Sequence, residues 1–224
     1  MTNIECKYSS SGAVLYTCGD KTVEFFVVPE TVTRIAALAF ANCDNLKQII
    51  FPRNLKKIED NAFKECSALE EIDLSSSKLK EIGKNVFCNC KYLKKVSLPD
   101  TLETISFQAF AGCTSLCEIR FPGKLKGIES FAFQGCSMLD SVNIPASVET
   151  IGNNAFEKCV SLQLFRARNC EGRRAAPNNG REELDPWGRD VAHGENGRPV
   201  DSVENCADKY VLGRFANCRY FLCY

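Results

Sequence analysis

The sequence predicts a β-rich solenoid built from repeats, and three observations lead to this prediction. Phenylalanine recurs every 23 or 24 residues, each time with isoleucine five residues before it and cysteine three residues after it. A leucine follows three residues after each cysteine, and proline marks most of the repeats. A fixed period of this length is typical of folds in which successive coils of the chain stack. The phenylalanine column consists of Phe40, Phe63, Phe87, Phe110, Phe133 and Phe156.

Each repeat contains three segments in order. The first, L-x-x-I-x-ϕ, alternates apolar and polar residues as a short strand does, and the following proline ends it because proline has no N–H to donate. The second, L-x-x-I, predicts a short second strand or turn. The third, A-F-x-x-C-x-x-L, has apolar residues three apart, which suits a single helical turn. One coil cannot bury its own apolar side, but coils stacked at about 4.8 Å can. We therefore expect six to seven coils with a parallel, concave sheet.

Different segments are expected at the two ends of the array. Residues 1–22 contain two strand-like runs separated by Ser-Ser-Ser-Gly, and they predict an N-terminal β cap over the first coil. Residues 23–165 form the solenoid. Residues 166–224 contain one lysine and no isoleucine but are rich in arginine and glycine, so we expect a poorly ordered tail. This change of composition is typical of a recent fusion or an out-of-frame extension, and the sequence does not distinguish these from a functional tail.

The repeat resembles the BspA-like (Treponema-type) leucine-rich repeat. The segment Ile151-Gly-Asn-Asn-Ala-Phe-Glu-Lys-Cys-Val-Ser-Leu is close to that family's consensus, and the resemblance covers residues 23–165. It implies a curved solenoid used for binding, in a family of bacterial and protist-parasite surface proteins associated with adhesion. The tail is not part of the resemblance.

Catalytic and metal chemistry find little support in the composition. The chain has one histidine, His193, which lies with Asp190, Glu195 and Trp187 in the tail and is expected to be a solvated loop residue. No phosphate-binding, nucleophile-elbow or zinc-protease motif is present. We therefore predict no enzyme, no cofactor and no metal site, with tail residues as the remote alternative source of an activity.

The net charge and the hydropathy of the sequence disfavour two classes of partner, nucleic acids and the membrane interior. Twenty-eight basic residues balance twenty-eight acidic ones, which disfavours binding to nucleic acid. No apolar run reaches the roughly 18 residues that a membrane span needs, so no membrane insertion is predicted. The first residues do not have the pattern of a signal peptide.

The fourteen cysteines admit three interpretations: metal ligands, disulfides or packing residues. Six of them fill one inward column, and stacked neighbours lie within disulfide distance. Packing is favoured because free cysteine behaves as a small buried apolar residue. The other eight show no zinc spacing, and many unpaired thiols suit a reducing setting. The six of the column are Cys43, Cys66, Cys90, Cys113, Cys136 and Cys159.

The outward positions of the first strands are the candidate binding site. They comprise an apolar patch followed by acidic and mixed positions, and apolar patches with polar rims often mark protein contacts. The alternative is that the N-terminal cap folds over Phe25 and Val27 and makes them core. The candidate residues are Phe25, Val27, Gln48, Ile50, Glu71, Asp73, Lys95, Ser97, Glu118 and Arg120.

These observations predict a non-enzymatic module that binds a protein partner, whose identity and oligomeric state the sequence leaves open. A cell-surface or extracellular adhesion role is what the family resemblance implies. An intracellular scaffold or interaction protein is the alternative, which the thiols and the absence of a signal-peptide pattern favour.

Overall fold

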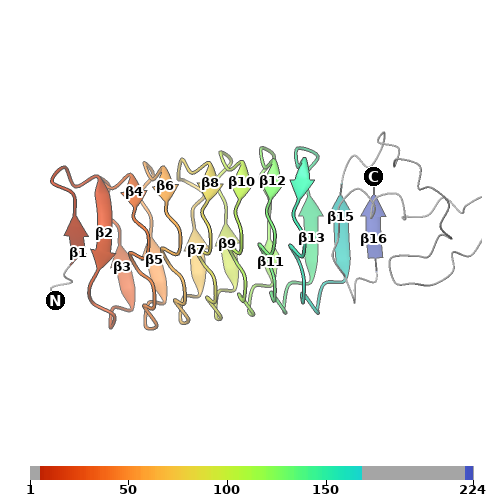
Figure 1. Cartoon of the computed structure of the whole chain (residues 1–224), viewed down its shortest axis with the longest axis horizontal. Coiled ribbons are helices and arrows are strands. Elements are labelled where there is room, and N and C mark those ends of the chain that lie inside the picture. Colours follow the sequence, from red (N-terminus) through yellow and green to blue (C-terminus); the bar gives the residue numbers. More distant parts are fainter. Residues whose placement is uncertain (1–5, 168–219, 224) are drawn as a thin grey trace, which may run out of the picture.

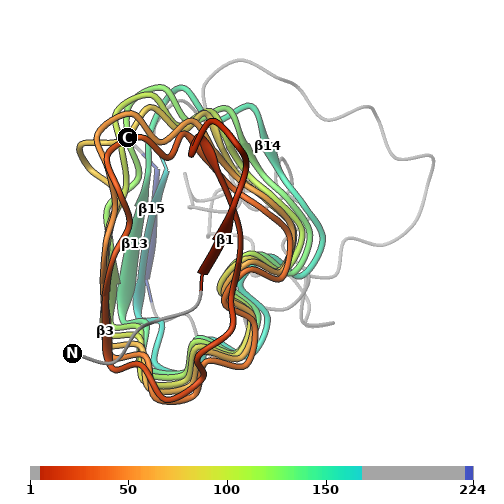
Figure 2. The same cartoon turned by 90° about the vertical axis from the view of Figure 1, so that its left-hand side faces the viewer.

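The computed structural model describes residues 6–167 and 220–223, and these form a β-solenoid in which each repeat is one coil (Figure 1). In each coil a first strand lies on one side of the solenoid and a second strand on the other (Figure 2). The first strands are β3 (Phe25–Val27), β5 (Gln48–Ile50), β7 (Glu71–Asp73), β9 (Lys95–Ser97), β11 (Glu118–Ile119), β13 (Ser141–Ile144) and β15 (Leu164–Ala167). The second strands are β4 (Arg34–Ile35), β6 (Lys57–Ile58), β8 (Glu81–Ile82), β10 (Thr104–Ile105), β12 (Gly127–Ile128) and β14 (Thr150–Ile151).

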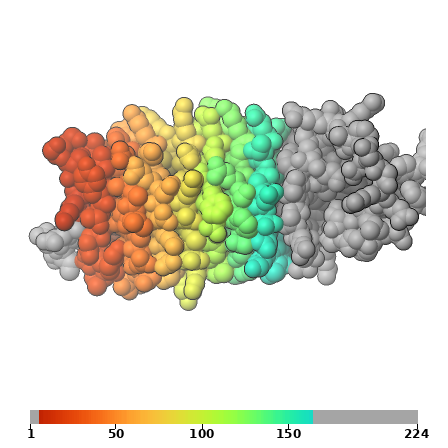
Figure 3. All heavy atoms as spheres, viewed as in Figure 1, coloured from red at the N-terminus to blue at the C-terminus, as the bar shows by residue number. Residues whose placement is uncertain are grey.

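Strands of successive coils pair in parallel, so each residue lies beside its counterpart one repeat away. The first strands form a five-stranded sheet, β3-β5-β7-β9-β11, followed by a three-stranded sheet, β13-β15-β16, in which β16 is Tyr220–Cys223. The second strands form the sheet β8-β10-β12-β14 and part of the sheet β1-β2-β4-β6, in which β1 is Cys6–Tyr8 and β2 is Val14–Cys18. In the pair of β3 and β5, for example, Phe26 stands opposite Ile49 and Val27 opposite Ile50. The predicted parallel solenoid is therefore confirmed, and its coils follow one another as successive bands in Figure 3.

The core is a set of columns that run the length of the solenoid. The six repeat phenylalanines are buried, and the rings of neighbours in the column stack with centroids 4.9–5.5 Å apart and planes within 19° of parallel. Stacked aromatic pairs stabilise the fold by about 0.5–1.5 kcal/mol beyond the burial of their area. The isoleucine and leucine columns are buried as well. The sequence period thus places each apolar side chain on its counterpart in the next coil.

The predicted helical turn in each coil is wrong. No helix occurs among residues 6–167 and 220–223. In every repeat the residues two before and two after the phenylalanine have positive φ angles of 53–73°, which no α-helix tolerates. They are Leu38, Asn42, Asn61, Glu65, Asn85, Asn89, Gln108, Gly112, Phe131, Gly135, Asn154 and Lys158.

Backbone hydrogen bonds explain why this segment is a series of turns. The N–H of Phe40 donates to the carbonyl of Ala62 in the next coil at 2.8 Å, and the N–H of Asn42 donates to Lys64 at 2.8 Å. The N–H between them, on Ala41, donates to Leu38 within its own coil at 3.1 Å. Because alternate amides point to the neighbouring coil, they are not available for the i→i−4 bonds of an α-helix.

The cysteine column links the coils by hydrogen bonds. From Cys66 onward, each thiol donates to the carbonyl oxygen of the phenylalanine in the preceding coil, at 3.0–3.2 Å. Burial raises the pKa of Cys113 and of Cys136 well above the ordinary thiol value, so both stay protonated and able to donate. The six cysteines of the column therefore act as buried packing residues, and the five from Cys66 onward also donate to a buried carbonyl.

The ends of the solenoid differ in their strand pairing. At the N-terminal end β1 (Cys6–Tyr8) and β2 (Val14–Cys18) form an antiparallel pair, and β2 continues in parallel onto β4. At the C-terminal end β16 (Tyr220–Cys223) pairs in parallel with β15. Poor order was expected for residues 166–224. Most of that tail, residues 168–219 and 224, lies outside the described part of the chain, so this expectation stays a prediction.

Candidate functional site

The candidate residues lie together on one surface, the outward side of the sheet β3-β5-β7-β9-β11, which we call the open face. Residues that flank the buried centre of each first strand form two columns on it. Phe25 stands opposite Gln48, and Lys95 opposite both Glu71 and Glu118. In the second column Val27 stands opposite Ile50, and Asp73 opposite Ser97. Ser97 is half-buried, while the other nine candidate residues are exposed, Arg120 just beyond β11 among them.

The N-terminal end of the open face is apolar. Phe25, Val27 and Ile50 are 47%, 52% and 47% exposed, although side chains of this kind usually lie inside. The alternative in which the cap covers Phe25 and Val27 is therefore wrong. The reason is topological: β2 pairs with β4 of the second-strand side, so the cap extends the opposite sheet. We call these three residues the apolar patch.

The charges along the rim of the open face are paired within the protein. Lys47 contacts Glu24 at 2.9 Å, and Lys94 contacts Glu70 at 3.1 Å, each pair joining two neighbouring coils. Further along, Arg120 contacts Glu118 at 2.8 Å on the face itself. Exposed pairs of this kind contribute little stability, about 0–1 kcal/mol. Their effect is to give the rim alternating charge.

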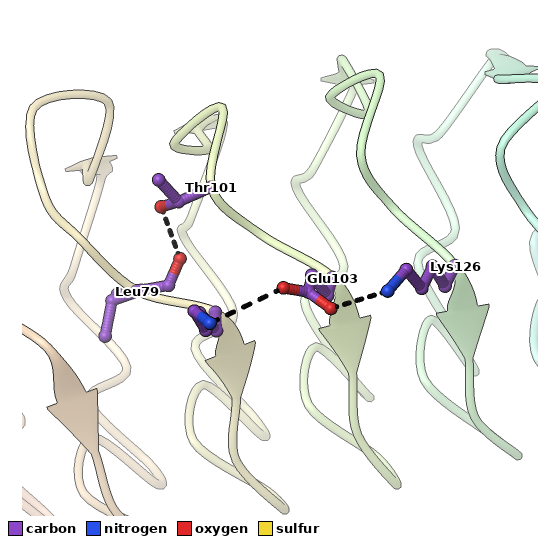
Figure 4. A network of polar contacts seen from close by, with 5 residues as sticks. Leu79, Thr101, Glu103 and Lys126 are labelled. Carbon is purple, nitrogen blue, oxygen red and sulfur yellow. Dashed lines mark hydrogen bonds and ion pairs between the residues drawn. The ribbon is translucent and has the colours of Figure 1, made fainter.

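A second ionic series lies on the second-strand side of the solenoid (Figure 4). Glu103, just before β10, lies 2.9 Å from Lys126 and 3.8 Å from Lys80, so one carboxylate joins three coils. The Thr101 hydroxyl donates to the carbonyl of Leu79 at 2.6 Å in the same region. The hydrogen bond from Lys126 and its charge lower the pKa of Glu103, and the same contact raises the pKa of Lys126. These groups contact each other, which indicates a structural role.

We expect the contribution of Glu103 to stability to disappear in acid. Its pKa is lower in the folded chain than in the unfolded chain, so its stabilisation is present above the unfolded value and is lost as the pH falls through the folded value. Because the site is exposed, Glu103→Gln should lower the urea midpoint only slightly at pH 6. The difference between the midpoints of Glu103→Gln and the parent should shrink as the pH falls from 6 toward 3; a difference that grows in acid contradicts this prediction.

Metal-ligating side chains do not gather in the described part of the chain. Residues 6–167 and 220–223 contain no group of three metal-ligating side chains. His193, Asp190, Glu195 and Trp187 lie outside the described residues. No helix in the described part is long and apolar enough to cross a membrane.

Sequence reasoning missed a second set of exposed apolar side chains. Leu38, Tyr92, Met138 and Val160 are 55–60% exposed and lie in the turns around the phenylalanine and cysteine columns, away from the first strands. The sequence contained a signal for two of them. Tyr92 and Met138 stand two residues after a cysteine of the column, a position that polar Asn45 occupies in the first coil. They are scattered along the turns, whereas the residues of the apolar patch belong to two paired strands.

A comparison with protein-family models matches the repeats of the chain to one family. The family model described as BspA type leucine-rich repeat region matches in six copies, over residues 15–113 and 80–170. Comparison with curated proteins gives no significant match.

Among solved structures, a leucine-rich repeat protein from Eubacterium ventriosum matches with 23% identity and a TM-score of 0.54, over 85% of this chain and 51% of that one. The chain therefore spans about half the length of that protein. A leucine-rich repeat protein of T. pallidum matches with 25% identity and a TM-score of 0.47, over 74% of this chain and 68% of that one. The family match extends over more than half of the residues, and the chain belongs to the BspA-type leucine-rich repeat family.

Proposed function

We propose that this chain is a non-enzymatic protein-binding module whose docking surface is the open face. Membership of a leucine-rich repeat family supports a repeat-based interaction module in general terms. The observation that supports the open face as the docking surface is the apolar patch, in which three large side chains on two adjacent strands are about half exposed. Apolar groups gathered on a rigid surface with a polar rim are typical of protein contacts.

The rigidity of the open face favours binding. The inner strands β5, β7 and β9 are each paired on both sides, β3 and β11 form the edges of the sheet, and the central residues Phe26, Ile49 and Ile72 are buried. Such a surface loses little conformational entropy when a partner binds, so more of the interaction energy appears as affinity. The backbone groups of the inner strands are already paired, so recognition is left to the outward side chains.

The charge pattern narrows the chemistry of the partner. Glu71 and Asp73 stand exposed on β7, directly beyond the apolar patch, and Lys95 follows on β9. A complementary partner segment would place an apolar side chain on the apolar patch and a basic side chain beside Glu71 and Asp73, one coil further along. Charged complementarity of this kind sets orientation and specificity more than affinity.

A peptide selection on the immobilised full-length chain tests the proposal. We expect selected peptides to carry an apolar residue near a basic one, and Ile50→Asp to weaken their binding at least about tenfold, which corresponds to about 1.4 kcal/mol. The matched control is Val160→Asp, which places the same charge on a side chain that is 57% exposed away from the open face. It should bind like the parent. Equal losses in both variants, or no loss in either, would refute the open face as the docking surface.

The cellular setting is a separate part of the proposal. Family resemblance supports a surface or adhesion role, in which the open face contacts a protein outside the cell. Labelling of intact cells with an antibody against the solenoid should then give a signal without permeabilisation. A signal only after permeabilisation would favour the alternative, an intracellular scaffold that uses the same surface.

A further inference from the structure

The N-terminal cap contains two cysteines that face each other across a pair of strands. Cys6 on β1 stands directly opposite Cys18 on β2 in the antiparallel register. Directly opposed residues in such a pair have Cα atoms about 4.5 or 5.5 Å apart, and both spacings lie within the range that a disulfide needs. Side chains of directly opposed residues lie on the same face of a strand pair, and each of the two thiols influences the pKa of the other. The register therefore places the two residues at a Cα separation that a disulfide can span.

We propose that Cys6 and Cys18 form a redox-active pair that a low-molecular-weight disulfide of the glutathione type converts into a cross-strand disulfide fastening β1 to β2. This inference concerns the cap and does not depend on the function proposed for the open face. It assigns a modification site to the edge of the sheet β1-β2-β4-β6.

The burial of the two thiols sets the order of the steps. Cys6 is half-buried and Cys18 is fully buried, so the oxidant reaches Cys6 first. The Cys6 thiolate attacks one sulfur of the low-molecular-weight disulfide, whose S–S bond breaks and releases one thiol that takes up the proton lost by Cys6. The Cys18 thiolate then attacks the Cys6 sulfur of the mixed disulfide and releases the second thiol with the proton of Cys18. Two protein thiols are oxidised, and one small disulfide is reduced to two thiols.

A third thiol lies near the pair and is the competing partner. Cys43 begins the cysteine column and is fully buried, and the ammonium of Lys21 donates to its sulfur at 3.5 Å. The neighbouring Cys66 thiol, followed by the charge of Lys21, lowers the pKa of Cys43 below the ordinary thiol value. Only Cys6, however, is held opposite Cys18 by strand register, and only Cys6 is open to an oxidant among these three.

The tryptic peptides of the full-length chain distinguish the two pairings. Cleavage after Lys7, Lys21, Arg34 and Lys47 puts Cys6 in peptide 1–7, Cys18 in peptide 8–21 and Cys43 in peptide 35–47. The chain is incubated with oxidised glutathione at pH 8, because burial raises the pKa of Cys6 and that of Cys18, the latter to about 12. Remaining thiols are then alkylated before digestion. We expect peptide 1–7 joined to peptide 8–21, and separation of the two after reduction.

Exposed Cys117 serves as an internal control for the oxidant, since its glutathionylation shows that the reagent has acted. A link between peptides 8–21 and 35–47, or alkylated Cys6 and Cys18 beside modified Cys117, would overturn the proposal. The map is made on the unaltered chain, so its outcome does not depend on any variant folding.

Thermal melting tests whether the bond fastens the cap. Oxidation should raise the melting temperature of the chain by about 6–12 °C, the shift expected for a short loop closed in a protein of this size. The gain should vanish in Cys6→Ser and persist in Cys43→Ser. An unchanged melting temperature in a chain whose peptides 1–7 and 8–21 are linked would overturn the fastening role.

Discussion

Phe110→Ala is expected to lower the free energy of unfolding by about 3–5 kcal/mol, the largest effect of any change considered for this protein. The Phe110 ring is fully buried and stacks between Phe87 and Phe133, with centroids 5.3 Å apart on both sides. Alanine removes both stacking contacts and leaves a cavity in the middle of the column. Because each coil of a repeat array contacts only its neighbours, the cavity also weakens the coupling between the two halves of the solenoid.

Urea unfolding followed by circular dichroism measures this loss, with two control variants in the same coil region. Phe107→Ala removes a phenylalanine that is 36% exposed and contacts one ring, Phe131, so its cost should be clearly smaller. Arg120→Ala changes a side chain that is 90% exposed and should leave the midpoint within error. A Phe110→Ala protein that unfolds at the midpoint of the Arg120→Ala protein would show that the phenylalanine column contributes nothing to stability.

Gly152→Ala is expected to destabilise the chain by about 1–3 kcal/mol because the added methyl group has no room. A Cβ at Gly152 would meet the backbone nitrogen of Ser130 at a separation that real Cβ atoms do not show, and would lie 2.6 Å from the carbonyl carbon of Glu129. These atoms belong to the backbone of the preceding coil, which cannot rotate away as a flexible side chain does. The N–H of Gly152 also donates to Ile128 at 2.7 Å, which holds the two coils at this close approach.

Gly123→Ala is the matched control, because a Cβ there meets no atom within 4 Å. Thermal unfolding of the two variants should separate them, with Gly123→Ala close to the parent and Gly152→Ala below it. Other coils carry a side chain in the column of Gly152, for example Ser106. If both glycine variants melt together, the backbone of Ser130 yields to the added methyl group, and the close approach at Gly152 does not limit stability.

The inward columns were predictable from the sequence because their side chains recur at a fixed period. The prediction for Phe110 and its counterparts needed no knowledge of the turns between them, since any stacking of coils superimposes residues one repeat apart. The same argument placed Phe25 and Ile50 on the outward side of their strands, where the structure has them exposed. Strand alternation determines the side to which a residue points.

The turn segment shows how a correct spacing led to a wrong conformation. Apolar residues three apart are compatible with a helical turn and equally with successive tight turns. Asparagine or glycine at several positions two before or two after the phenylalanine, such as Asn61 and Gly112, was the available signal, because these residues adopt positive φ at low cost. The next coil determines the conformation, because its carbonyls accept hydrogen bonds from the amides that a helix would use internally.

By itself, then, the sequence determined the stacking of coils, the buried columns and the outward positions of the open face, because all three follow from periodicity. Only the tertiary structure decided that the cap extends the second-strand side and leaves the apolar patch exposed. It alone decided that Cys6 meets Cys18, because the register of an antiparallel pair with an irregularity between Lys7 and Tyr8 does not follow from residue spacing. These features depend on contacts between segments that do not repeat, and such contacts leave no period in the sequence.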